Sequence, residues 1–421
     1  MPSDTRPPKA AHKTAGPFGG LRATVAVAGM YGVAAVVWAV VGEVLPGGRW
    51  LAVHLFTAGV LTNLVVGLTA HFTETLTRGS LSAGGRRGRL VTVNVGALAL
   101  LGGLPAGLGW VSAAGGLVLL AAVMWLYIDL RRARRQSLGS RFLFVVRAYE
   151  RACGAFVHGS LLGAAMAAGV LGGAWYAAAR IAHLQVMVLG WGGIVLLATV
   201  VFFGPTVLRA RIEAGADETA GRALGITSWA LTVAGLALLL TGLGGAGATI
   251  AQGVAGAGLA VYAVASTSVC LPVLRTARRA EGTVPGRMLA AACGWFVVAG
   301  WANVLVVATG RFDLLARLGV VALAGVLGQA ILGALTYLTP MVMRLQSDTR
   351  RRVRARLELG WPARVWLFNA GVVAVAGAGP APIGATASTA VAGVGWAMIL
   401  ATLAMLPAMT LWALVRAPRA A

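Results

Sequence analysis

The sequence has few charged residues for its length, and few of those are acidic. Of 421 residues, 11% are charged, with 12 Asp and Glu against 35 Lys and Arg. A soluble domain has about 25% charged residues, so this composition excludes an ordinary soluble protein. With 58% hydrophobic residues and a mean hydropathy of +0.83, the chain is predicted to be an all-α integral membrane protein in the lipid bilayer.

Cysteine is also scarce, which removes several kinds of site. The three cysteines, Cys153, Cys270 and Cys293, lie in apolar segments and lack C-x-x-C spacing, so we expect them to be small buried side chains. The sequence has no P-loop, no nucleophile constellation and no cysteine–histidine zinc spacing. No catalytic residue is therefore assigned.

Carboxylates are missing from the middle of the apolar stretches. Glu74, Asp129, Glu150 and Asp313 all fall near the ends of such stretches or in loops. Ion-coupled transporters commonly carry a carboxylate at mid-membrane, so their absence here disfavours a proton- or sodium-driven transporter.

Long apolar stretches dominate the rest of the chain. About twelve of them approach the ~20 residues that a membrane helix requires, with boundaries uncertain by ~2–4 residues. They are predicted at 23–45, 50–73, 89–108, 110–130, 152–172, 181–204, 223–242, 247–270, 288–308, 316–340, 363–379 and 387–415.

The net charge of +23 comes from arginines in the loops after every second stretch. This alternation follows the positive-inside rule, which indicates a membrane topology and disfavours nucleic-acid binding. It predicts a plasma-membrane protein with both termini in the cytoplasm. Residues 1–21 are expected to be a flexible cytoplasmic tail, and residues 22–421 a single polytopic membrane domain.

A spaced glycine–arginine pair indicates an internal repeat. The second, sixth and tenth stretches each hold a glycine followed nineteen residues later by an arginine, as Gly59–Arg78, Gly190–Arg209 and Gly325–Arg344. In the last two copies a proline, Pro205 or Pro340, follows the glycine by fifteen residues. Because the copies lie four helices apart, we expect three pseudo-repeats of four helices, with the three glycine-bearing helices near the centre.

Histidines supply the candidate ligands. Apart from His12 in the tail, the predicted topology places His54 and His183 near the outer surface and His71 and His158 near the inner surface. His54 and His71 are ~25 Å apart along one helix, so a single metal cannot bind both. Histidines inside a membrane are rare and usually functional. The sequence therefore predicts an outer pair and an inner pair, with His54 and His183 as the preferred metal ligands.

Haem b is the expected cofactor, with copper as a further possibility. Haem iron takes axial imidazoles from facing helices, and Gly59, Gly67, Gly190 and Gly193 are candidates for leaving room beside a macrocycle. The alternative interpretation is that the histidines are structural and donate hydrogen bonds to backbone carbonyls.

The segments HLFTAGVLTNLVVGLTAHFTETLTR, HGSLLGA, AHLQVMVLGWGGIVLLATVVFFGPTVLR and GQAILGALTYLTPMVMR carry a family resemblance. Their arrangement resembles the catalytic subunit of haem–copper oxidases, and is more similar to the NnrS-type haem/copper membrane proteins. The resemblance implies twelve helices in three arcs, a haem or haem/copper centre, and an electron donor or cupredoxin-like partner.

The sequence departs from that family in its histidines. Four lie in membrane stretches, fewer than an oxygen-reducing centre needs, and 316–340 has none. Ile181-Ala182-His183 stands where the resemblance implies His-x-His. The expected function is electron transfer, or the handling of nitric oxide or oxygen under redox stress. The alternative is a polytopic transporter or membrane assembly factor with structural histidines.

Overall fold

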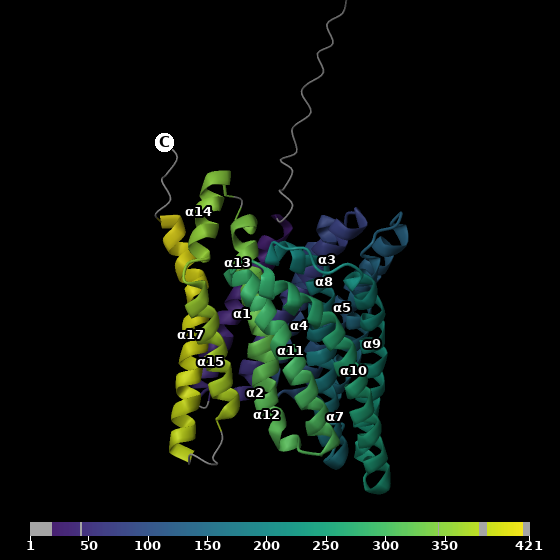
Figure 1. Cartoon of the computed structure of the whole chain (residues 1–421). Helices are drawn as coiled ribbons and strands as arrows, with labels where there is room; N and C mark the ends of the chain where they lie inside the picture. The colour runs from purple at the N-terminus through teal and green to yellow at the C-terminus, as the bar shows by residue number, and fades with distance from the viewer. Residues whose placement is uncertain (1–18, 43, 344, 379–384, 416–421) are drawn as a thin grey trace, which may run out of the picture.

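The computed structural model describes residues 19–42, 44–343, 345–378 and 385–415, which form a bundle of long helices and include no sheet (Figure 1). Of the predicted tail 1–21, only 19–21 are among these residues, and they form a short 3-10 turn, η1 (Gly19–Leu21). His12 lies outside the described residues. The chain is thus an all-α, multi-pass membrane protein, as its composition predicts.

Helices occupy all twelve predicted stretches. In chain order the elements are α1 (Arg22–Val41), α2 (Gly48–His54), η2 (Leu55–Leu61), α3 (Thr62–Thr77), α4 (Ala83–Gly103), α5 (Gly109–Gln136), α6 (Leu143–Ala167), α7 (Gly173–Gln185), η3 (Val186–Ile194), α8 (Val195–Leu208), α9 (Ala216–Leu240), η4 (Thr241–Leu243), α10 (Gly245–Arg279), α11 (Val284–Ala308), η5 (Phe312–Leu314), α12 (Leu315–Val320), η6 (Val321–Gly328), α13 (Gln329–Val342), α14 (Ser347–Leu357), α15 (Trp361–Gly377) and α17 (Ala385–Val415).

The number of clear membrane spans is lower than the predicted twelve. Among the described residues, nine helices are long and apolar enough to cross a membrane. A tenth is reached if α14 and α15, which meet at a 50° bend, count as one span. Helices α4 and α6 are long but are not among the nine, because charged residues such as Arg89 and Arg151 reduce the hydropathy of their first turns.

Three of the spans are interrupted by π-helix. The second predicted stretch consists of α2, η2 and α3, the sixth of α7, η3 and α8, and the tenth of α12, η6 and α13. The repeat glycines Gly59, Gly190 and Gly325 lie in η2, η3 and η6 respectively. All three segments therefore have π-helix at the glycine of the predicted repeat. This shared feature is notable because π-helix is rare and often marks functional sites.

The arginines of the repeat also share a conformation. Arg78 and Arg209 follow α3 and α8 in the left-handed region, with φ of 53° and 54°. They are the non-glycine residues with positive φ in the described part of the chain. Such a conformation is uncommon for a residue with a Cβ atom. The third arginine, Arg344, is outside the described residues.

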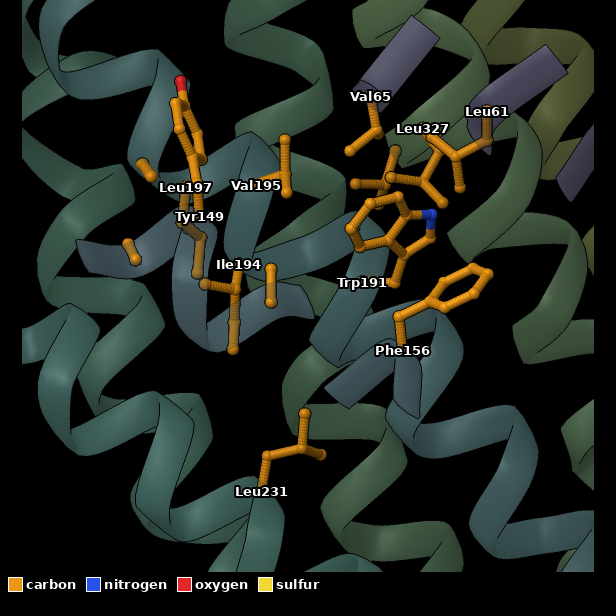
Figure 2. Packing of buried hydrophobic residues seen from close by; sticks show 14 of the residues in the cluster. Leu61, Val65, Tyr149, Phe156, Trp191, Ile194, Val195, Leu197, Leu231 and Leu327 are labelled. Atoms are coloured by element: carbon orange, nitrogen blue, oxygen red, sulfur yellow. The ribbon is translucent and has the colours of Figure 1, made fainter. Parts of the chain in front are cut away.

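The three interrupted helices meet at Trp191, in the core of the bundle (Figure 2). Trp191 of η3 is 1% exposed, and its indole nitrogen donates to Thr62 Oγ1 at 3.3 Å. Its ring meets Phe156 of α6 edge-on, with centroids 4.8 Å apart. A Cβ atom on the neighbouring Gly192 would lie 3.0 Å from Leu327 of η6 and 3.4 Å from Leu61 of η2. Glycine at 192 therefore permits this close approach.

The three spans that contain π-helix differ in how deeply they are buried. The most apolar stretches of Gly48–Thr77 and Gly173–Leu208 are 56% and 61% buried, more than any other described span. The corresponding value is 39% for Phe312–Val342, below the 50% of Val284–Ala308. The prediction of a central position therefore holds best for the second and sixth stretches, and less well for the tenth.

The two described ends of the chain lie at the same end of the bundle (Figure 1). Arg22, at the start of α1, donates from Nε to the carbonyl oxygen of Val342 at 2.7 Å. Near the end of α17, the Trp412 ring lies 4.5 Å from the Arg356 guanidinium of α14. We call this the arginine-rich end, because the loops with most arginines lie there.

Candidate functional site

The structure brings His54 and His183 together, as their matched depth in the membrane predicts. Their ring centroids are 6.5 Å apart and their planes differ by 18°. His54 is the last residue of α2, directly before η2, and His183 lies in α7 two residues before its end. Both helices begin at the arginine-poor end of the bundle, so the pair lies in that half of the membrane domain (Figure 1).

Each imidazole is oriented by a hydrogen bond to a backbone carbonyl. His54 Nδ1 lies 2.8 Å from the oxygen of Trp50, and His183 Nδ1 lies 2.7 Å from the oxygen of Gly159. Since a carbonyl can only accept, Nδ1 carries the proton in both rings and Nε2 has a free lone pair. Metal-binding histidines usually have this arrangement, in which the nitrogen that does not bind the metal donates to a carbonyl.

Trp50 and Gly163 pack against the two rings. The Trp50 ring stacks on His54 with centroids 4.2 Å apart and an interplanar angle of 23°. Gly163 of α6 lies close to His183, since an added Cβ would be 3.1 Å from Cε1 of the ring. The glycine lets α6 approach the imidazole closely. Trp50, Gly159 and Gly163 were not predicted as part of the site.

The spacing of the rings suits one shared metal atom. A metal bonded to one nitrogen of each ring at ~2.0 Å would hold the centroids about 6 Å apart. The described residues contain no group of three or more His, Cys, Asp or Glu side chains placed to hold a metal ion. A four-coordinate ion bound by protein alone is therefore not supported. The donor set fits haem iron, whose macrocycle supplies four nitrogens, or a copper ion with two ligands.

The glycines expected to make room for a macrocycle instead accommodate protein side chains. A Cβ atom on Gly59 would lie 2.5 Å from the Tyr31 ring, and one on Gly190 would lie 2.5 Å from Cβ of Ala155. Gly67 faces Thr24 in the same way, and Gly193 faces Tyr262 and Phe296. These four positions therefore serve close packing between helices. None of these four glycines therefore leaves room for a macrocycle.

The predicted inner pair is not brought together by any ring contact in the part of the chain that the structure describes. His158 is exposed on the surface of α6, while His71 is half-buried beside Phe72, with ring centroids 5.8 Å apart. Their assignment as ligands remains a prediction without geometric support. The three cysteines are buried and free, which confirms their prediction as small buried side chains.

The predicted repeat would relate the site to an amide pair in the core. His54 precedes Gly59 by five residues, and Gln185 precedes Gly190 by the same interval. Gln185 is 1% exposed and exchanges two hydrogen bonds with Asn303 of α11, at 2.8 and 2.9 Å. The residue directly before the π-helix is therefore polar in both copies. The sequence offers the signal for Gln185, since glutamine is rare in a stretch this apolar.

No protein-family model and no curated protein matches the chain.

Proposed function

We propose that this chain is an integral membrane redox protein whose metal centre is bound by His54 and His183, with haem b as the cofactor. The proposal rests on the close approach of two nearly parallel imidazoles, with ring centroids 6.5 Å apart and an interplanar angle of 18°. The carbonyl hydrogen bonds at both Nδ1 atoms support it, because they leave both Nε2 atoms available to one iron. The resemblance to haem–copper oxidase-like proteins agrees with this assignment.

The surrounding residues would prepare the ligands for the metal. The carbonyls of Trp50 and Gly159 hold the tautomer and the orientation of each ring. The Trp50 ring limits rotation of His54 by stacking on it. A haem held by His54 and His183 would supply one-electron transfer, with a potential set by its ligands, their hydrogen bonds and burial. The function proposed is electron transfer, or the handling of nitric oxide or oxygen, with an electron donor as partner.

A copper centre is the second candidate, and the filled glycines favour it. Because Gly59 and Gly190 pack against Tyr31 and Ala155, they leave no space for a planar macrocycle beside them. A copper ion held by His54 and His183 would need no such space. Imidazole is a suitable ligand for copper.

We also infer three pseudo-repeats of four helices, with both termini in the cytoplasm of a plasma-membrane protein. The shared π-helices at Gly59, Gly190 and Gly325 support the repeat, as do the matching φ angles of Arg78 and Arg209. The positive-inside rule assigns the arginine-rich end to the cytoplasm. The metal site then lies in the outer half of the membrane, accessible to a donor outside the cell.

The test is an absorption spectrum and a metal analysis of the purified full-length protein. A Soret band with one equivalent of iron supports haem, and one equivalent of copper without that band supports the second candidate. His54→Ala and His183→Ala should each remove the metal, whereas His71→Ala should retain it. A protein without iron or copper under loading conditions would instead favour structural histidines and a transporter or assembly role.

A further inference from the structure

A cavity of ≈ 880 Å³ opens at the arginine-rich end of the bundle, away from the histidine pair. It lies between the turn that follows α3 and the loop that joins α5 to α6. Arg78, Arg132 and Arg141 line it together with Asp129, Leu81 and Leu138. The proposed metal centre uses none of these residues.

The lining carries positive charge that the protein does not neutralise. Asp129 is bound by the buried Arg89, and Arg141 is bound by Asp217 through two hydrogen bonds of 2.5 and 2.9 Å. Arg78 and Arg132 are exposed and have no carboxylate partner among the described residues. Two guanidinium groups therefore remain to attract an anion into the cavity.

The repeat shows what an arginine at this turn can bind. Arg209 is equivalent to Arg78, has the same left-handed backbone, and donates to Glu358 at 2.6 Å and to Glu281 at 3.4 Å. In the second repeat the guanidinium is thus met by carboxylates of the protein. In the first repeat the corresponding group lines a cavity. An anion from outside the chain would supply the missing partner.

We propose that this cavity binds the phosphate group of an anionic phospholipid through Arg78 and Arg132. Guanidinium groups bind phosphate with two parallel hydrogen bonds, and basic pockets at the ends of membrane helices bind lipid headgroups. Soluble phosphate has the same chemistry, but the lining favours a lipid. Leu138, at the rim, is fully exposed, so an apolar side chain is available to contact acyl chains.

The experiment measures lipid binding to the full-length protein in detergent by native mass spectrometry. Phosphatidylglycerol is titrated against phosphatidylcholine, and inorganic phosphate is tested as a competitor. The variants are Arg78→Gly, which keeps the left-handed turn without strain, and Arg132→Gln. The matched control is Arg131→Gln, because Arg131 is an exposed neighbour that contacts Tyr127 and does not line the cavity.

We expect the wild type to prefer phosphatidylglycerol, and each variant to bind it about tenfold more weakly than Arg131→Gln does. Equal binding of both lipids, or unchanged binding in both variants, would overturn the proposal. Inorganic phosphate that binds as tightly as phosphatidylglycerol would also overturn it, since the cavity would then be a site for soluble anions.

Discussion

Arg78 and Arg209 end α3 and α8 with φ of 53° and 54°, in positions related by the same glycine spacing. A left-handed residue with a Cβ atom costs roughly 1–2 kcal/mol, yet both positions hold an arginine and not a glycine. Two separate segments of the chain therefore share both the turn and the guanidinium, as the proposed internal repeat predicts.

The backbone strain at Arg78 predicts a stabilising substitution. Arg78→Gly should raise the thermal midpoint of the protein in detergent, by an amount that corresponds to about 1 kcal/mol, because glycine adopts positive φ freely. Arg78→Ala removes the same charge but keeps the strain, so it is the control. Equal midpoints for the two variants would contradict the left-handed turn.

The contact between Gly59 and Tyr31 predicts a local packing defect. Gly59→Ala places a methyl group 2.5 Å from the Tyr31 ring, so it should cost about 1–3 kcal/mol of stability. Gly154→Ala in α6 is the control, since its Cβ would meet no atom within 4 Å. We expect Gly154→Ala to be neutral or stabilising. Thermal unfolding followed by tryptophan fluorescence compares the two, and equal midpoints would refute the close packing of η2 against α1.

The pair of Gln185 and Asn303 predicts non-additive energies. Gln185→Leu leaves the Asn303 amide buried without its partner and should destabilise by about 1–2 kcal/mol. Combining it with Asn303→Leu should recover most of that loss, because neither partner is then left unsatisfied. A double-mutant cycle of thermal stabilities measures this coupling. Additive losses would show that the two amides do not interact.

The orientation in the membrane predicts the labelling of introduced cysteines. Ser80→Cys, in the exposed loop after α3, should react with an impermeant maleimide only in opened cells. Ala106→Cys, in the exposed turn between α4 and α5, should react in intact cells. The native cysteines are buried, so background labelling is low. The reverse pattern would place the arginine-rich end outside the cell.

The positions of the helices could largely be predicted from the sequence, because apolar stretches and the polar loops between them mark where each helix begins and ends. The proximity of His54 and His183 followed from their similar distances to Arg49 and Arg180. Other features depend on tertiary contacts. Hydropathy does not distinguish π-helix from α-helix, so the interruptions at Gly59 and its equivalents were not predicted.

Contacts between particular helices could not be predicted from the sequence either. That His183 would donate to Gly159, or that Gly59 would face Tyr31 and not a cofactor, depends on which helices pack together. The predicted stretches 89–108 and 152–172 left out most of the charged residues at the start of α4 and α6, so these two helices looked like ordinary spans.

The absorption spectrum of the reconstituted protein shows whether His54 and His183 bind one metal. Wild-type protein loaded with haem should give a six-coordinate, low-spin Soret spectrum, which His54→Ala and His183→Ala each abolish and His12→Ala preserves. Loading with copper should give one equivalent that the same two variants lose, if copper is the metal. Retention of the bound metal in both His54→Ala and His183→Ala would rule out a metal shared by these two histidines.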